Sequence, residues 1–189
     1  MKTFWNKILF MLALKTAKRK PALKPAPKTA KLPQKLVNLA KKEVGVEEVN
    51  GTNCGPRVDE YKSATFLNPK KGWPWCAAFI CWLFREAMED EKYTFKRPRT
   101  ASAWDFENWC RQQDQSVILK KPHANDIQAG DVIVFTFSHI GLAISAPDKN
   151  GFVTTVEGNT DSTGSREGGG VFKKKRHVSK IRSRIRVMV

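Results

Sequence analysis

Apolar residues in the first half of the chain recur at the spacing of an amphipathic helix. The strongest pattern follows Cys76, where apolar side chains repeat at i, i+1, i+4, i+5 and i+8 from Phe79, and no Gly or Pro interrupts the run to Met88. Because this spacing places them on one face, it predicts a helix that begins at Cys76. Weaker helical patterns cover residues 36–44, 58–66 and 100–113, the last with Thr100 or Ser102 as its N-cap.

After Pro122 the pattern changes to short β-branched runs separated by turn residues, which is typical of strands. These runs cover residues 131–137, 140–145, 151–156 and 181–189, and residues 147–151 form a hairpin connection that ends in Asn-Gly. In the last run, Arg182, Arg184 and Arg186 alternate with apolar residues, so we expect a half-buried strand whose arginines face solvent. Helices followed by antiparallel strands predict an α+β fold, with the helices on one side of the sheet.

Composition divides the chain into three parts. Residues 1–14 form an apolar segment that is too short to span a bilayer and fits a weak secretory signal, an interfacial helix or a partner-docking helix. Residues 15–34 are rich in Lys, Pro and Ala, which favours an extended, solvated linker. We predict a single globular domain over residues 35–189.

The formal net charge of +16 comes from the two ends of the chain. Residues 1–35 hold 10 Lys/Arg and residues 171–189 hold 8, with no Asp/Glu in either, whereas residues 36–170 carry a net charge of −2. Such ends favour polyanions, among them nucleic acid, anionic lipid and the polymers of a bacterial envelope. Apart from Phe172, no aromatic residue is interleaved with the basic runs, which argues against a stacking platform for nucleic acid.

The chain has four cysteines and no C-x-x-C pair, which disfavours a zinc finger or a redox dithiol. Cys76 follows a rigid Trp-Pro-Trp loop and opens the predicted helix, where unpaired N–H groups and the helix dipole favour a thiolate. Cys76 is therefore a candidate nucleophile, and the alternative is a small buried core side chain. Cys81 lies about 140° further round the helix, so we expect it in the core.

A cysteine nucleophile needs a base, and three histidines are candidates. His123 lies in a polar loop and His177 in a lysine cluster, whereas His139 stands at the head of a predicted strand. Glu157 and Asn159 are two residues apart on the following strand, so they project to the same side and either could orient the His139 ring. The alternative for His139 is a structural histidine at a strand end.

Taken together, these motifs resemble the CHAP family of papain-like cysteine amidases and peptidases, which cut bacterial peptidoglycan. The resemblance rests on residues 75–79 (WCAAF), 130–132 (GDV), 138–141 (SHIG) and 156–159 (VEGN), in that order. Residues 53–58, 99–104 and 165–168 also look familiar from that group. The resemblance extends over residues 36–176, which is nearly the whole predicted domain.

The resemblance implies a papain-like fold in which N-terminal helices pack on an antiparallel sheet of about five or six strands. It also implies an N-acetylmuramoyl-L-alanine amidase or a peptidoglycan endopeptidase. In that reading Cys76 is the nucleophile, His139 the general base and acid, and Glu157 the residue that orients the histidine. Asn159 corresponds to an assisting polar group, and the Cys76 backbone N–H is a candidate oxyanion donor.

Trp73 and Trp75 flank the nucleophile, where they either wall the substrate groove or pack in the core. Some relatives bind calcium through an acidic loop before the cysteine, but no Asp or Glu lies between Tyr61 and Cys76, so we predict no metal and no cofactor.

The resemblance implies an enzyme that acts at the bacterial cell wall or periplasm, as a phage-type lysin or as a wall-remodelling or toxin-like enzyme, and we expect a monomer. We expect peptidoglycan as its partner, with the basic ends on anionic envelope polymers, no specific nucleic acid and no transmembrane segment. Phage release, injection and secretion all fit as delivery routes. The alternatives are a non-catalytic polyanion- or wall-binding module and a protein-directed cysteine peptidase of similar fold.

Overall fold

The computed structural model describes residues 31–121 and 126–189. The helices are α2 (Leu32–Lys42), α3 (Pro56–Lys62), α4 (Cys76–Ala87) and α5 (Asp105–Arg111), and a short 3-10 helix, η1, spans Val178–Lys180. The strands are β1 (Val117–Lys120), β2 (Val132–Phe135), β3 (Ile140–Ala143), β4 (Phe152–Thr160), β5 (Gly170–His177) and β6 (Ile181–Val187). Helices come first and strands follow, so the predicted α+β class is confirmed.

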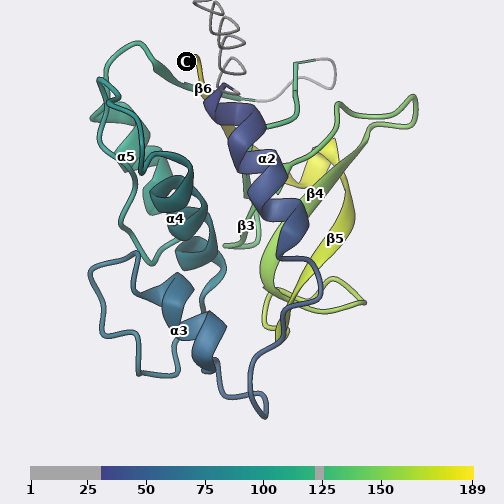
Figure 1. The fold of residues 1–189 in the computed structure, drawn as a ribbon. Coiled ribbons are helices and arrows are strands. Elements are labelled where there is room, and N and C mark those ends of the chain that lie inside the picture. The colour runs from purple at the N-terminus through teal and green to yellow at the C-terminus, as the bar shows by residue number, and fades with distance from the viewer. Residues whose placement is uncertain (1–30, 122–125) are drawn as a thin grey trace, which may run out of the picture.

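The described strands form one antiparallel sheet in the order β1-β6-β2-β3-β4-β5. The last strand, β6, therefore inserts between β1 and β2, while β3, β4 and β5 follow one another as hairpins. The helices lie together on one side of the molecule, and β4 and β5 form a long twisted hairpin on the other (Figure 1). Helix α4 packs against β3 and β4, which places the start of the helix beside these two strands.

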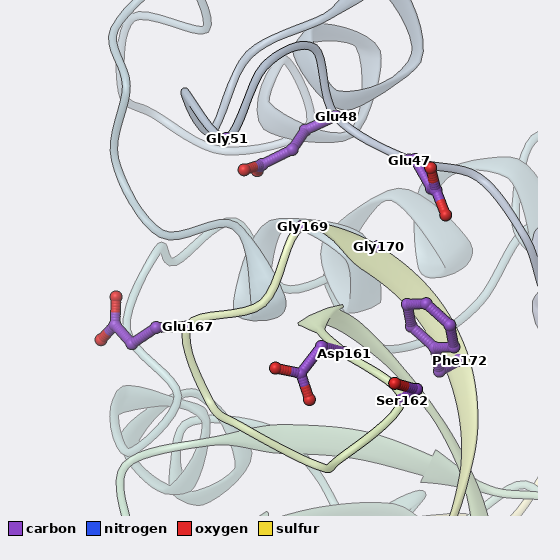
Figure 2. A pocket seen from close by; sticks show the side chains of 9 residues that line it. All are labelled: Glu47, Glu48, Gly51, Asp161, Ser162, Glu167, Gly169, Gly170 and Phe172. Atoms are coloured by element: carbon purple, nitrogen blue, oxygen red, sulfur yellow. The ribbon is translucent and has the colours of Figure 1, made fainter.

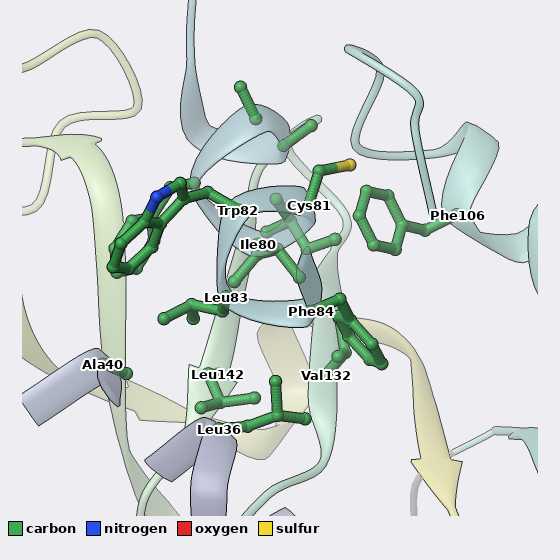
Figure 3. Packing of buried hydrophobic residues seen from close by; sticks show 14 of the residues in the cluster. Leu36, Ala40, Ile80, Cys81, Trp82, Leu83, Phe84, Phe106, Val132 and Leu142 are labelled. Carbon is green, nitrogen blue, oxygen red and sulfur yellow. The ribbon is translucent and has the colours of Figure 1, made fainter. Parts of the chain in front are cut away.

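Helix α4 is the centre of the hydrophobic core. Ten of its residues are buried, and only Arg85 and Glu86 reach the surface. A helix that is apolar nearly all round must be covered on every side, and α2, α3, β3 and β4 provide that cover. In Figure 3 the side chains of Leu36 and Leu142 lie below Leu83, toward the sheet and α2. The predicted start of this helix at Cys76 is confirmed, and close packing along its length holds that end in place.

The helix predicted over residues 100–113 is shorter than its sequence pattern suggests. It begins at Asp105 with Trp104 as N-cap, so neither Thr100 nor Ser102 caps it. The Thr100 hydroxyl instead accepts a hydrogen bond from the backbone N–H of Ser102 at 3.1 Å, which bends the chain into a local turn. Residues 99–104 therefore form a loop, and this loop reaches the side of the molecule where α4 begins.

The prediction that the arginines of β6 face solvent is wrong for two of the three. Arg184 is 1% exposed and pairs with Asp126 at 2.5 Å. Arg186 makes two hydrogen bonds to the Asp131 carboxylate, both at 2.7 Å. The strand lies inside the sheet between β1 and β2, so these cations are covered and need carboxylate partners.

Strands β1 and β5 were not among the predicted runs. The sequence of β5 includes Lys-Lys-Lys-Arg, which favours a solvated segment, yet its backbone pairs with β4 along almost its whole length. The exposed Lys173 and Lys175 permit this because their charged ends reach water while their stems cover the sheet. Helix α2 likewise begins at Leu32, slightly before the predicted end of the linker.

The apolar segment 1–14, linker residues 15–30 and His123 lie outside the described residues. Within the part of the chain that the structure describes, no helix has the length and apolar character needed to cross a membrane.

Candidate active site

Cys76 is the first residue of α4 and is almost buried, with 6% of its surface exposed. The residue before it, Trp75, is the N-cap, and its backbone N–H donates to Oδ1 of Asn159 at 2.8 Å. The backbone N–H of Phe79 donates to the Trp75 carbonyl and closes the first helical turn. The sulfur is therefore held at the N-terminus of α4, beside backbone N–H groups that have no intrahelical acceptor.

His139 lies directly before β3, after Ser138, whose φ of 54° turns the chain sharply. Its ring is fully buried and stacks against Phe137 and Phe135, with ring centroids 5.9 and 6.0 Å apart. Nε2 lies 3.1 Å from Oε2 of Glu157, although the N–H direction is not aligned with that oxygen. The contact is therefore mainly electrostatic, and the stacking aromatics fix the plane of the ring.

The charge state of His139 follows from its neighbours. Burial alone would lower the pKa of the ring, but the interactions with Cys76 and then with Glu157 outweigh burial and raise the pKa to about 9. The sulfur and the carboxylate thus both stabilise the protonated imidazolium. A protonated imidazole beside a cysteine sulfur is the arrangement that a cysteine–histidine nucleophile site requires.

Glu157 belongs to β4 and is completely buried. Burial would raise its pKa, but hydrogen bonding and charge from His139 and Arg176 lower the pKa to about 2. The Arg176 guanidinium grips the carboxylate, with Nε 3.0 Å from Oε1 and Nη2 2.5 Å from Oε2. The hydroxyl of Thr155 donates to Oε1 at 2.5 Å. A buried carboxylate held in this way stays ionised and fixed in position.

Arg176 is a site residue that the sequence analysis missed. It comes from β5, lies over the rings of Phe135 and Phe137 at 5.5 and 5.2 Å, and also donates to the carbonyl of Gly164 at 3.1 Å. In the sequence it is the last member of a basic run, which suggests a solvated strand face. Only the pairing of β5 with β4 brings it to Glu157.

Asn159 stands at the end of β4 in a left-handed conformation, with φ of 56°. Besides accepting from Trp75, its Nδ2 donates to Oδ1 of Asn53 at 3.1 Å and to the carbonyl of Gly168 at 2.8 Å. The side chain therefore ties three loops together at the residue before Cys76. The Asn159 side chain makes no hydrogen bond to the His139 ring, so its geometry suits a positioning group for the nucleophile.

A groove of about 230 Å³ opens over Cys76. It is lined by Leu67, Trp73, Pro74, Cys76, Ala101, Ser102, Ala103, Ser138 and Arg166. Trp73 is one of its walls, as one interpretation of the sequence requires. Trp75 is not, because its ring is fully buried and stacks on Tyr61 at 5.6 Å, so the expectation that it contacts substrate is corrected to core packing. Arg166 is a second basic residue near the site that the sequence analysis did not single out.

The loop before Cys76 is anchored by a buried lysine. Lys62 has no exposed surface, and its ammonium donates to the carbonyls of Asn53 and Lys71 at 2.7 and 2.8 Å. It also pairs with Asp59 at 3.2 Å and lies 5.6 Å from the centre of the Trp73 ring. This cation draws together the two segments that lead into the groove wall.

A second cavity, of about 420 Å³, lies between residues 47–51 and the 161–170 loop and carries the carboxylates of Glu47, Glu48, Asp161 and Glu167 (Figure 2). Glu48 accepts a hydrogen bond from the Trp75 indole at 3.0 Å and so helps to hold the N-cap residue of α4 in place. Across residues 31–121 and 126–189, no three His, Cys, Asp or Glu side chains are grouped closely enough to hold a metal ion.

The remaining predicted residues take the following places. His177 lies at the far end of β5, where its ring accepts a hydrogen bond from Ser179, so it plays no part in the groove. Cys81 is fully buried, its sulfur is directed to the side of α4 that faces Phe106 in Figure 3, and burial strongly raises the pKa of its thiol. The prediction that Cys81 lies in the core is confirmed.

Comparisons with known proteins identify a matching domain family and one similar solved structure. Residues 68–159 match the family model of the CHAP domain, a span that includes Cys76, His139, Glu157 and Asn159. Among solved structures, the wild-type endolysin LysIME-EF1 is similar, with a TM-score of 0.49 and 15% sequence identity. The match covers 82% of this chain and 63% of that endolysin. No curated protein sequence matches the chain.

Proposed function

Since the chain belongs to the CHAP domain family over residues 68–159, we propose that it is a peptidoglycan hydrolase that cleaves an amide bond through Cys76. The observation that carries this proposal is the grouping of a helix-terminal cysteine, a buried histidine with its pKa raised to about 9, and an ionised carboxylate. A cysteine that serves only in packing would not require a charged histidine beside it at the floor of an open groove.

In the proposed reaction the Cys76 thiolate attacks the amide carbonyl and His139 protonates the leaving amine. The resulting thioester is then hydrolysed by water, which His139 deprotonates. Glu157 orients the imidazole and balances its charge, while Arg176 keeps that carboxylate ionised. As the first residue of α4, Cys76 has a backbone N–H without an intrahelical acceptor, and this group can donate to the oxyanion.

Either the amide between sugar and L-alanine or a peptide bond of the stem or cross-bridge fits a groove bordered by Trp73 and Arg166. The enzyme would then act at the cell wall, with its basic ends on anionic envelope polymers. Mass spectrometry of fragments released from several peptidoglycan types would identify the bond that is cut.

The test of the proposal is the release of soluble fragments from purified peptidoglycan. We expect Cys76→Ala and His139→Ala to abolish release, while Cys81→Ala, a matched change five residues along the same helix, retains it. All variants should keep the circular dichroism spectrum of the wild type. Undiminished release by Cys76→Ala would refute the thiolate mechanism.

Thiol alkylation at mildly acidic pH separates the proposed enzyme from a non-catalytic binding module. An ordinary thiol, with a pKa of roughly 8.5, reacts slowly there, whereas a thiolate paired with an imidazolium reacts fast. We expect Cys76 to be labelled long before Cys81 and Cys110, which are buried in the core. Slow labelling of Cys76 would favour the binding module.

A further inference from the structure

A basic cavity of about 350 Å³ adjoins the groove and has no part in the chemistry proposed above. Three cationic side chains, Lys96, Arg97 and Arg99, line it, and Asp105 is the one acid in its lining. Its wall also includes Phe66, whose side chain is 74% exposed. Phe66 therefore places a large exposed aromatic ring beside three cationic side chains.

The Arg99 guanidinium is held in position and is available to bind an anionic ligand. It lies 4.1 Å from the centre of the Phe66 ring, which holds its plane in place. Among the described residues no carboxylate lies within ion-pair distance of it, whereas Arg97 donates to the carbonyls of Ala64 and Pro98. Burial and then the charge of Arg99 lower the pKa of Arg97. An anion in the cavity would relieve this repulsion between the two arginines.

The cavity and the groove share the same two chain segments. Phe66 and Thr100 line the cavity, their neighbours Leu67 and Ala101 line the groove, and the backbone N–H of Phe66 donates to the carbonyl of Arg99 at 3.2 Å. A ligand that extends along this pair of segments would therefore reach both.

The distance that such a ligand must span, from the cavity to Cys76, can be estimated from the rise of α4. The carbonyl of Thr100 lies 3.3 Å from the sulfur of Cys81, which is five residues after Cys76. Five residues are about 7.5 Å of helical rise, so the cavity is on the order of 10 Å from the nucleophile. An extended peptide advances about 3.3 Å per residue, so roughly three residues would bridge that gap.

We propose that Arg99 and Phe66, with Lys96 and Arg97, form a subsite for a carboxylate of the peptidoglycan stem peptide, roughly three residues from the amide that Cys76 attacks. The inference rests on the proposed function and names what the same groove recognises. A guanidinium fork binds a carboxylate through two parallel hydrogen bonds, and the Phe66 face packs against the neighbouring aliphatic part of the peptide. Arg99 is a specificity-determining residue here.

The experiment measures binding without turnover. Fluorescence anisotropy in the Cys76→Ala background gives the Kd of a labelled stem tetrapeptide with free carboxylates, and of the same peptide with its carboxylates converted to amides. We expect the amidated peptide to bind at least about tenfold more weakly, and Arg99→Gln to remove this difference. Arg99→Lys should restore part of it, because the charge remains and the fork is lost. Lys175→Gln, the same loss of charge at an exposed position on β5, should leave both Kd values unchanged.

Equal affinity for the two peptides, or a preference that survives Arg99→Gln, would overturn the subsite. Equal weakening by Lys175→Gln would also overturn it, since the effect would then be net charge alone. The proposed function is judged separately by fragment release from peptidoglycan with Cys76 intact. A protein that releases no fragments yet binds the carboxylate peptide through Arg99 would therefore refute the hydrolase and retain the binding site.

Discussion

Replacing Arg176 by Met removes the cation that holds Glu157 ionised in the protein interior. The carboxylate has no exposed surface, and the Arg176 side chain is 14% exposed and bonds to both carboxylate oxygens. Breaking a buried pair by deleting one partner costs about 3–5 kcal/mol, because the other charge remains buried. We expect a loss of about 3 kcal/mol in the free energy of unfolding at pH 7 for Arg176→Met.

The size of this loss should depend on pH in a definite direction. The pKa of Glu157 is lowered from 4.5 to about 2, which corresponds to about 3 kcal/mol of stabilisation of the ionised form. A lowered pKa contributes stability that is present above pH 4.5 and is lost as the pH falls through 2. The gap between wild type and Arg176→Met should therefore be full at pH 7 and should shrink between pH 4.5 and 2.

Urea unfolding followed by tryptophan fluorescence at several pH values measures both effects. Lys173→Met is the matched control, since Lys173 is an exposed base on the same strand, and it should change stability little. The double variant Arg176→Met with Glu157→Gln should recover part of the loss, because no buried charge is then left unpaired.

Activity gives a second, independent readout of the same substitution. Without Arg176, one of the two charged groups that oppose the effect of burial is lost, so the pKa of Glu157 should rise. The acid limb of the pH–rate profile of kcat/KM should then move up by about one unit or more. A variant within about 1 kcal/mol of wild type at pH 7, or one with an equal loss at every pH, would refute this account of Arg176.

Two further predictions concern the other groups around the nucleophile. Asn159→Ala removes the acceptor for the Trp75 N–H, so we expect a loss of about 1–3 kcal/mol in stability and a fall in kcat larger than any change in KM; unchanged kcat in a folded variant would refute a positioning role. Because the pKa of His139 is raised from 6.5 to about 9, its protonation stabilises the fold below pH 6.5, and this contribution is lost as the pH rises through 9. We expect an NMR titration of the ring to show this pKa, and Cys76→Ala to lower it; a ring that titrates near 6.5 in the wild type would contradict the proposed ion pair.

Local sequence patterns predicted the helix and the strands that carry the candidate site residues. The apolar run after Cys76 could only be a buried helix, and the Trp-Pro-Trp loop before it fixed where that helix begins. The Ser-His-Ile-Gly motif leads into β3, and the Val-Glu-Gly-Asn motif lies in the second half of β4. Gly141 shows how closely β3 and β4 approach each other, since an added Cβ there would come within 2.6 Å of the Glu157 side chain.

The tertiary structure decided which charged and aromatic side chains are buried and which partners they contact. From the sequence alone, the basic run of residues 173–176 is predicted to face solvent. Only the pairing of β5 with β4 brings the Arg176 guanidinium into contact with the Glu157 carboxylate. The same holds for Arg184, buried because β6 inserts into the middle of the sheet. Trp73 and Trp75 are only two residues apart, yet Trp73 lines the groove and Trp75 lies in the core.

The physical reason is the range of the interactions involved. Helix and strand patterns arise from the periodicity of neighbouring residues, so they can be read along the chain. The burial of a charge is decided by which distant segment supplies its partner, and the pKa of His139 depends in the same way on Cys76 and Glu157. The sequence by itself thus determined the α+β class and indicated the three candidate side chains Cys76, His139 and Glu157, although it missed β1 and β5. The fold decided which cation lies against the Glu157 carboxylate.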